Sequence, residues 1–312
     1  MNSALKSHAN GRIAVFTDDP GWHGKRLQRA FAARGYAAEF VSLTECRVDL
    51  ESGIGGIVLP GFEQRLPDGV FVRGVPGGTL EQVILRLDFL HVLPAIGVPV
   101  YNSARAIERS VDKAMTSLLL HQAGIPTPPT WVAESETQAR ALLMREVARG
   151  HELVLKPLFG SQGAGLRRLA HPADLPAGEE YRNVYYLQRY VGAESGGWED
   201  YRVLVVGGAS RAAMKRKGAN WINNVAQGAA CEAAPADAEL YALAEAATRA
   251  LAMDYAGVDL IRDREGRLSV LEVNSIPAWR GLQSVVEADI AGLLADDLLD
   301  RYVAKNQRER CA

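Results

Sequence analysis

Two apolar runs joined by the short polar turn DREG constrain this chain more than any other feature. The runs are GVDLI (257–261) and LSVLEVN (268–274), and together they predict a β-hairpin. Because alternate side chains of a strand share a face, Glu272 and Asn274 point the same way, and pairing across the hairpin brings Asp259 beside them. Two carboxylates and an amide in an apolar setting favour a bound cation, and Mg²⁺ prefers such oxygen ligands. The alternative is that the two acids are ordinary charges at strand ends.

A glycine-rich segment lies upstream of this hairpin. In VLKPLFGSQGAGL (154–166), Lys156 ends an apolar strand and a loop with three glycines follows. Glycine tolerates the dihedral angles that let backbone amides surround phosphate oxygens, and the lysine would add a positive charge. Since the lysine precedes the glycines, the segment matches neither a Walker-type P-loop nor a Rossmann fingerprint. Alone it could equally be the tip of a hairpin, but the acids downstream favour a nucleotide site.

Composition narrows the class of protein. A length of 312 residues favours about two domains, and a net charge of −2 gives no basic field for nucleic acid. Three scattered cysteines argue against a disulfide framework. No apolar run approaches the roughly 18 residues of a membrane span, and the N-terminus lacks the apolar core of a signal peptide. We therefore expect a cytoplasmic protein that binds neither nucleic acid nor membrane.

Strand and helix patterns alternate over the first hundred residues. RIAVFTDDP (12–20) predicts a strand and turn, and residues 23–36 and 79–97 predict helices. Such alternation is typical of a doubly wound parallel sheet. The proline cluster IPTPPTW (125–131) ends a further helix, and the remainder predicts α+β structure, with a helix over 235–253. The predicted domains are an N-terminal α/β domain over 1–105, a small α+β lobe over 106–190 and a C-terminal α+β lobe over 191–312.

The order of several motifs resembles that of the ATP-grasp superfamily, and most closely the RimK-like α-L-glutamate ligases. The motifs are Lys113 before a helix, the strand lysine Lys156, the loop GSQGAG, YLQRYV (186–191), DYRVLVVGG (200–208), AAMKRKG (212–218) and the D…ExN acids. This resemblance covers about residues 100–285. The stretch 70–102 is similar to a subgroup tied to glutamylated one-carbon carriers of the tetrahydromethanopterin or methanofuran kind. The resemblance implies an ATP-grasp fold, in which two α+β lobes follow the N-terminal domain and enclose ATP.

The resemblance also implies a reaction. ATP phosphorylates a carboxylate, and an amine displaces phosphate from the acyl phosphate to form an amide, with L-glutamate added to a small-molecule acceptor. Mg²⁺, for which Mn²⁺ could substitute, would bind Asp259, Glu272 and Asn274 and bridge the ATP phosphates. The other residues implied to bind ATP are Lys113 and Lys156, the lid residues Gly160, Ser161, Gln162, Gly163 and Gly165, and the hinge Gln188, Arg189, Tyr190 and Val191.

Two details of the ATP site remain open. The family commonly has an acidic residue where this chain has Arg189, although a hinge that reads adenine through its backbone would survive that change. Glu194 is the first choice for the ribose hydroxyls and Glu199 its competitor, and both could instead be solvated loop acids.

Two arginines lie in apolar, strand-like runs where an unpaired guanidinium would be costly. They are Arg202 and Arg216, and a guanidinium fork suits carboxylate or phosphate. We expect Arg202 near the transferred phosphate and Arg216 near the acyl phosphate. Nearby, Asn224 fits the family pattern, but Ile222 and Ala226 stand where an arginine and a histidine are expected, so substrate identity cannot be carried over.

A further group of residues is a candidate for acceptor binding. Arg73, Trp279 and Arg280 could frame a bulky anionic acceptor, since an aromatic ring and guanidinium groups suit a ring-bearing anion. Alternatively, Arg73 is a surface residue and Trp279 a packed tryptophan in a capping turn. Trp22 and His23 follow the first strand, where doubly wound sheets bind ligands, although a lone histidine there is more often structural.

Two other functions compete with the ligase. One is a nucleotide-binding sensor or subunit without turnover, which a broken set of lysines or acids would indicate; the set is intact. The other is an ATP-grasp phosphotransferase, which sequence alone separates poorly from a ligase. The identity of the acceptor, the linkage, the number of residues added and homo-oligomer formation are left open.

Overall fold

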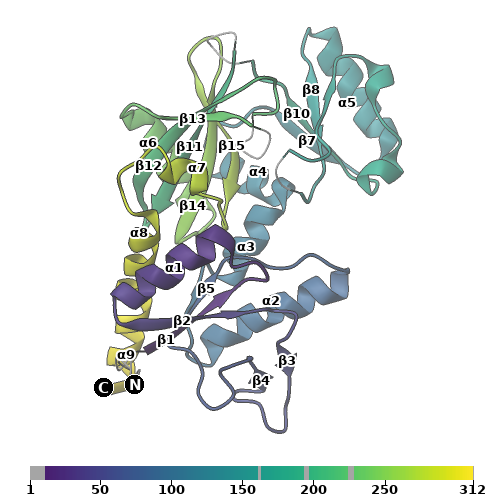
Figure 1. Cartoon of the computed structure of the whole chain (residues 1–312). Coiled ribbons are helices and arrows are strands. Elements are labelled where there is room, and N and C mark those ends of the chain that lie inside the picture. Colours follow the sequence, from purple (N-terminus) through teal and green to yellow (C-terminus); the bar gives the residue numbers. More distant parts are fainter. Residues whose placement is uncertain (1–10, 161–162, 193–196, 224–227, 312) are drawn as a thin grey trace. The chain divides into compact units, whose positions relative to one another are not determined.

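The structure is a computed structural model that describes residues 11–160, 163–192, 197–223 and 228–311. It divides into two compact units (Figure 1). The first comprises Met1–Ile107, Ala278–Gln283 and Glu287–Ala312, and the second comprises Glu108–Pro277 and Ser284–Val286. The C-terminal segment thus belongs with the N-terminal sheet, whereas the sequence placed it with residues 191–312. The separation of the lobes at 190 and 191 stays a prediction.

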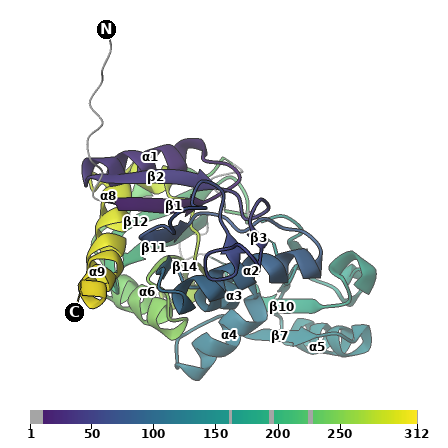
Figure 2. The same cartoon turned by 90° about the horizontal axis from the view of Figure 1, so that it is seen from below.

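A four-stranded parallel sheet forms the centre of the first unit (Figure 2). Its strands are β1 (Gly11–Phe16), β2 (Tyr36–Val41), β5 (Gly69–Val72) and β6 (Val100–Tyr101), in the order β2-β1-β5-β6. Helix α1 (Gly21–Ala33) leads from β1 to β2, and α2 (Leu80–Ala95) leads the opposite way, from β5 to β6. Because such crossovers are right-handed, the two helices cover opposite faces. The predicted doubly wound sheet is confirmed, and its direction reverses between β1 and β5.

Helix α2 shows how local sequence sets its own ends. Thr79 accepts a hydrogen bond from the Gln82 backbone N–H, and the Gln82 side chain accepts one from the Thr79 N–H, which forms a capping box. Gly97, just beyond the helix, has a φ of 82°, a left-handed conformation that glycine adopts without strain. The predicted helix over 79–97 is therefore confirmed.

The C-terminal helices belong to the first unit, and α8 packs on α1. They are α7 (Arg280–Gln283), α8 (Ile290–Leu298), a π-helical turn (Leu299–Val303) and α9 (Ala304–Cys311). Helix α8 buries its apolar face, and its Asp296 forms an ion pair with Arg34 at the end of α1. The Tyr101 hydroxyl donates to Asp297 at 2.6 Å. These contacts explain why the C-terminus joins the N-terminal sheet. A small hairpin of β3 (Arg47–Val48) and β4 (Ile57–Val58) adds to this unit.

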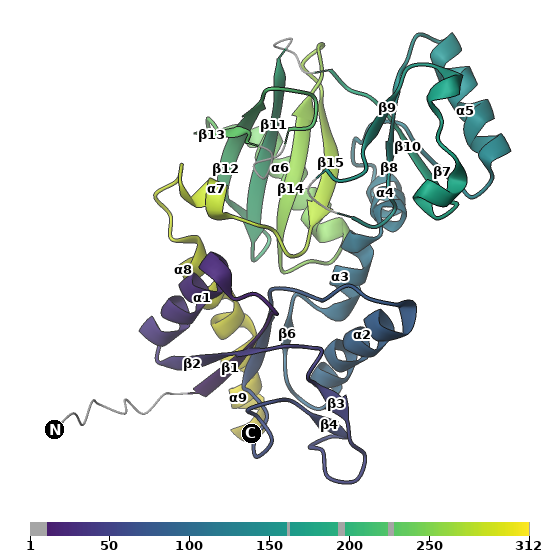
Figure 3. The same ribbon diagram turned by 45° about the vertical axis from the view of Figure 1, so that its right-hand side comes forward.

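The second unit contains two antiparallel sheets (Figure 3). The smaller has the order β7-β10-β8-β9, and α5 (Glu136–Ala148) covers it. Its strands are β7 (Thr130–Ala133), β8 (Leu153–Lys156), β9 (Arg167–Leu169) and β10 (Tyr185–Arg189), with short 3₁₀ turns at Pro172–Asp174 and Gly178–Tyr181. Helices α3 (Ala104–Val111) and α4 (Lys113–Gln122) precede this sheet. Its core is built from leucines, tyrosines and an alanine that are nearly inaccessible to solvent.

The larger sheet carries the predicted acidic hairpin. Its order is β13-β12-β11-β14-β15, with α6 (Ala238–Ala250) packed against it. The strands are β11 (Trp198–Val206), β12 (Ala209–Gly218), β13 (Ala230–Ala233), β14 (Tyr255–Arg262) and β15 (Leu268–Asn274). Asp259 lies directly opposite Glu272, and Gly257 opposite Asn274. The hairpin predicted over 257–274 is confirmed. In the described part of the chain, no helix is both long and apolar enough to cross a membrane.

A buried carboxylate ties α5 to the edge of the small sheet. The Glu146 side chain is 1% exposed, and its Oε2 lies 2.6 Å from Nη2 of Arg189 at the end of β10. Arg145 and Arg149 approach its other oxygen at 3.2 and 3.3 Å. Burial raises the pKa of Glu146, but these arginines outweigh that effect and the pKa falls below its usual range.

Glu146→Gln should lower the free energy of unfolding by about 3 kcal/mol, because it leaves a partly buried guanidinium without its counter-ion. Glu136→Gln is the matched control on the same helix: that carboxylate is 50% exposed and pairs with Arg140. Its loss should cost no more than about 0.5 kcal/mol. Urea denaturation measures both variants. Equal effects would show that the buried pair contributes nothing beyond a surface pair.

Candidate active site

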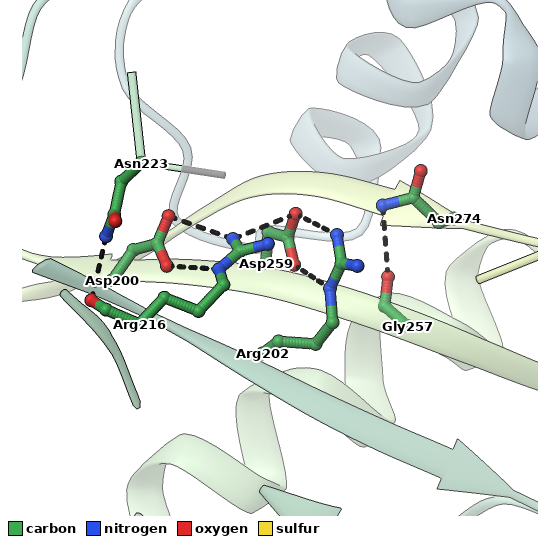
Figure 4. Close-up of polar contacts among 7 residues, drawn as sticks. All are labelled: Asp200, Arg202, Arg216, Asn223, Gly257, Asp259 and Asn274. Carbon is green, nitrogen blue, oxygen red and sulfur yellow. Dashed lines mark hydrogen bonds and ion pairs between the residues drawn. The ribbon is translucent and has the colours of Figure 1, made fainter. Parts of the chain in front are cut away.

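A chain of alternating charges crosses the large sheet (Figure 4). Asp259 accepts two hydrogen bonds from Arg202, at 2.7 and 2.6 Å, and Nη2 of Arg216 lies 3.2 Å from its Oδ2. Arg216 in turn forms a bidentate pair with Asp200, at 2.6 and 2.9 Å. Strand register brings these groups together, since Arg202 lies opposite Asp259 and Asp200 opposite Arg216. All four side chains therefore meet on one face of the sheet.

Burial makes this pairing necessary. Arg216 is 4% exposed and Asp259 is 5% exposed, and an unpaired charge there would be very costly. Burial raises the pKa of Asp259, but Arg202 and Arg216 outweigh it and hold the pKa below its usual range. Burial likewise opposes the charge of Arg216, but Asp259 and Asp200 outweigh it and raise its pKa. The expected phosphate contacts of the two arginines stay a prediction; in the structure both bind carboxylates.

The three predicted metal ligands share one face of the hairpin. Asp259 and Glu272 are cross-strand neighbours, and Asn274 lies two residues beyond Glu272. Asn274 donates from Nδ2 to the Gly257 carbonyl at 3.4 Å, and its Oδ1 points away from that carbonyl (Figure 4). Two carboxylates and an amide oxygen are ligands that fit Mg²⁺. No group of three His, Cys, Asp or Glu side chains among the described residues could hold a metal, so phosphate or water oxygens would have to complete the site.

Two lysines, Lys113 and Lys156, lie around the same cavity as Glu272. Lys113 begins α4, and its Nζ donates to the Gly160 carbonyl at 2.9 Å. Lys156 ends β8, and its Nζ donates to Oε1 of Gln188 at 2.7 Å. Both lysines and Glu272 line one small cavity of about 70 Å³. Burial lowers the pKa of Lys156 to about 8, against the opposing effect of Glu272. Burial also lowers the pKa of Lys113, again opposed by Glu272.

The glycine-rich loop requires its glycines. Gly160, Gly163 and Gly165 have φ values of 146°, 74° and 73°, where other residues would be strained. A Cβ on Gly165 would also lie 2.8 Å from Cγ of Pro157. Gly160 and Gly163 both line the cavity that also contains the two lysines. The predicted residues Ser161, Gln162, Glu194 and Asn224 lie outside the described residues.

Three residues of the predicted hinge, Gln188, Arg189 and Tyr190, make hydrogen bonds within the protein. Gln188 is buried, and its Nε2 donates to Thr130 Oγ1 at 3.0 Å. The backbone N–H groups of Arg189 and Tyr190 donate to Pro129 and Glu152. The Arg189 guanidinium is turned to Glu146 on α5. Outside the hinge, Glu199 accepts a hydrogen bond from Lys215 at 3.1 Å.

An open pocket of about 440 Å³ lies in the first unit. Arg73, Arg280, Trp22 and His23 line it together with the loops that follow β1 and β5. Trp279 does not line it: its side chain is 2% exposed and packs edge-on against Trp22 and His23. The packed tryptophan, the alternative interpretation of the sequence, is what the structure shows.

Comparison with known proteins identifies the family. The model of the RimK-like ATP-grasp domain matches residues 110–298. This chain belongs to the RimK-like ATP-grasp family. It is 36% identical over 236 residues to a tetrahydromethanopterin:alpha-L-glutamate ligase of Methanococcus maripaludis, covering 74% of this chain and 78% of that protein.

Two further relatives support the assignment. A probable alpha-L-glutamate ligase of Parasynechococcus marenigrum is 32% identical, covering 96% of this chain, which spans 64% of that longer protein. The structure of the ATP-grasp ligase PsnB complexed with minimal precursor has a TM-score of 0.72 and 23% identity, covering 94% of this chain and 99% of that one. The latter confirms the ATP-grasp fold.

The predicted ATP-site residues lie within the matched RimK-like ATP-grasp domain, whereas most residues of the pocket in the first unit lie outside it. The lysines, the glycine loop, the hinge and the acidic hairpin all lie within residues 110–298. Arg73, Trp22 and His23 lie outside that range.

Sequence reasoning missed Asp200, which pairs with Arg216. Asp200 lies two residues before Arg202 in an apolar strand and therefore shares its face, which could have indicated that this acid binds a nearby arginine. Tyr186, whose hydroxyl lies 2.7 Å from Ser117 Oγ beside Gln188, gave no such signal.

The surroundings of His23 in the pocket of the first unit lead to a testable prediction about its pKa. Burial lowers its pKa to about 4, and the nearby Arg73 and Arg280 add to the effect. Its Nε2 accepts a hydrogen bond from the Trp279 backbone N–H at 3.2 Å, which the neutral ring can do. As pH falls from 7 to 5, His23 should stay neutral while an ordinary histidine titrates near 6.5.

Nuclear magnetic resonance titration of the imidazole signals, assigned with His23→Gln, measures this pKa. Arg280→Ala should raise it towards the ordinary value, because one of the repelling charges is removed. A midpoint near 6.5 in the unaltered protein would show that the imidazole is not buried beside these arginines.

Proposed function

We propose that this chain is an ATP- and Mg²⁺-dependent α-L-glutamate ligase that forms an amide on a small-molecule acceptor through an acyl phosphate. The observation that carries the proposal is the convergence of Lys113, Lys156 and Glu272 on one cavity beside Asp259 and the glycine loop. Cations and metal-binding carboxylates at one place suit a polyphosphate with its metal ion. The naming of relatives as glutamate ligases supports the choice of amine.

The chain's own residues would position ATP. Lys113 and Lys156 hold loop and hinge oxygens in the structure and would turn to the phosphates of the bound nucleotide. Asp259, Glu272 and Asn274 would hold Mg²⁺, which neutralises phosphate charge when bound. The loop at 160–165 would exclude water, since an acyl phosphate that meets water is hydrolysed. A cytoplasmic location stays part of this proposal.

The reaction balances without a further reactant. A carboxylate oxygen of the acceptor attacks the γ-phosphorus of ATP, and ADP leaves. The glutamate amine then attacks the acyl carbon, phosphate leaves, and an amide remains. This chemistry depends on positioning and charge neutralisation more than on covalent help from the protein.

Burial distinguishes the roles of the two arginines. Arg216 is held between Asp200 and Asp259 and is almost inaccessible, so we assign it to positioning Asp259. The Arg202 side chain is 15% exposed and pairs with Asp259. It is therefore the arginine that can turn to an incoming phosphate or carboxylate when a cation takes over Asp259.

The products decide between the ligase and its competitors. Protein, ATP, Mg²⁺ and isotope-labelled L-glutamate are incubated with an extract of cells that lack this chain, and the mixture is examined by mass spectrometry. A ligase adds labelled glutamyl units to one acceptor and releases ADP and phosphate only when both acceptor and glutamate are present. A phosphorylated acceptor without glutamate would indicate a phosphotransferase, and nucleotide binding without ADP a sensor. AMP and pyrophosphate would rule out the acyl phosphate.

Glu272→Gln should lower kcat about a hundredfold or more, because it removes one carboxylate from the proposed Mg²⁺ site. The unliganded fold should lose little stability, since one of two neighbouring acids disappears. Glu265→Gln is the control: this acid lies in the turn of the same hairpin and pairs with Arg267 at the surface. Steady-state kinetics across a Mg²⁺ titration measure both variants. Wild-type turnover of Glu272→Gln throughout would remove Glu272 from the metal site.

A further inference from the structure

Asp200 is the one member of the charge chain on the large sheet to which the proposed function gives no task. It lies on β11 opposite Arg216 and two residues before Arg202, so the three side chains share one face. Asp200 is only 7% exposed, and an acid is rarely buried so deeply without a partner. Among the residues that the structure describes, its carboxylate binds Arg216 and no other side chain. Asp200 therefore acts through that guanidinium group.

Arg216 divides its contacts unequally between two acids (Figure 4). Its Nε and Nη2 bind the two oxygens of Asp200 at 2.6 and 2.9 Å. The same Nη2 lies 3.2 Å from Oδ2 of Asp259. A guanidinium fork matches a carboxylate best when it makes two parallel contacts. Arg216 thus makes its bidentate contact with Asp200 and only a single, longer contact with Asp259.

This division leaves part of Asp259 open. A carboxylate has about four acceptor sites on its two oxygens. Arg202 occupies two of them, at 2.7 and 2.6 Å, and Arg216 occupies a third. If Arg216 turned its whole fork to Asp259, all of these sites would be taken and none would remain for a metal ion. By holding Arg216, Asp200 prevents this.

Asp200 also balances the charge of the cluster. The two arginines and the two aspartates carry +2 and −2, which sum to zero. Without the charge of Asp200 the sum is +1, and this charge repels a divalent ion at Asp259 more strongly in a buried setting than in water. The open acceptor site and the balanced charge therefore act in the same direction, towards tighter binding of a cation.

We propose that Asp200 is a positioning residue of the metal site, which holds Arg216 away from Asp259 and thereby raises the affinity of Asp259 for Mg²⁺. The inference rests on the proposed function, in which Asp259 binds Mg²⁺ together with ATP. It assigns part of the metal affinity to a residue that is not one of the three proposed ligands.

Isothermal titration calorimetry of the whole chain tests this role. The Kd of ADP is measured with Mg²⁺ and with EDTA, and the ratio of the two values is the gain in affinity that the ion supplies. Burial raises the pKa of Asp200 to about 7 against the opposing effect of Arg216, so the titrations are made at about pH 8, where the carboxylate is ionised. Asp200→Asn should reduce the gain about tenfold. Glu232→Gln, which removes a surface acid of the same sheet that pairs with Lys217, should leave the gain unchanged.

A double variant separates positioning from a merely structural role. Asp200→Asn combined with Arg216→Met removes one charge of each sign, and with it the guanidinium group that would turn to Asp259. It should recover most of the lost gain, whereas a structural defect would be deepened by the second change. Asp200→Glu keeps the charge and should keep most of the gain. Thermal denaturation checks that each variant is folded.

Two results would overturn the role of Asp200 while leaving the proposed function intact. One is an equal Mg²⁺ gain in Asp200→Asn and the unaltered protein. The other is a double variant that recovers nothing relative to Asp200→Asn. If Asp200→Asn does not fold, a double variant with less than about a tenth of the normal gain overturns the role. No ADP binding, or no Mg²⁺ gain in the unaltered protein, would contradict the proposed function together with the inference.

Discussion

The bidentate pairing of arginine with aspartate inside the large sheet is the interaction on which the proposed active site depends. Asp259 could not remain charged at 5% exposure without Arg202 and Arg216 beside it. Antiparallel register supplies those partners, because Arg202 on β11 lies opposite Asp259 on β14 and Arg216 on β12 lies opposite Asp200. The sheet thus maintains an ionised carboxylate in a setting that would otherwise neutralise it.

The same reasoning extends to the lysines. Lys113 and Lys156 lose part of their solvation, which lowers both pKa values, and nearby carboxylates, Glu272 first among them, partly offset that loss together with backbone or amide oxygens. Such groups gain most when an anion arrives, because a phosphate replaces weak partners with strong ones. On binding, each lysine would exchange a protein oxygen for a ligand oxygen.

Sequence predicted the parts of this site that depend on local periodicity. The placement of the hairpin acids followed from the period of two along β15, and the helix expected over 79–97 corresponds to α2. Pairings between distant segments were not predictable, since Arg202 meets Asp259 only through the order of strands in the sheet. Arg189 likewise meets Glu146 only because α5 docks on β10, and the burial of Trp279 depends on α1. The expected roles of individual residues came from the resemblance to ATP-grasp ligases, because neither local periodicity nor the pairing of distant segments assigns a role.

The pairing of Arg202 with Asp259 has a consequence for whether folding depends on a metal ion. The Arg202 guanidinium already balances Asp259, so that carboxylate does not need a divalent ion to be buried. In zinc fingers, by contrast, the metal supplies the folding energy itself. Under the proposed function, the polypeptide would fold without the ion, and Mg²⁺ would bind afterwards together with the nucleotide.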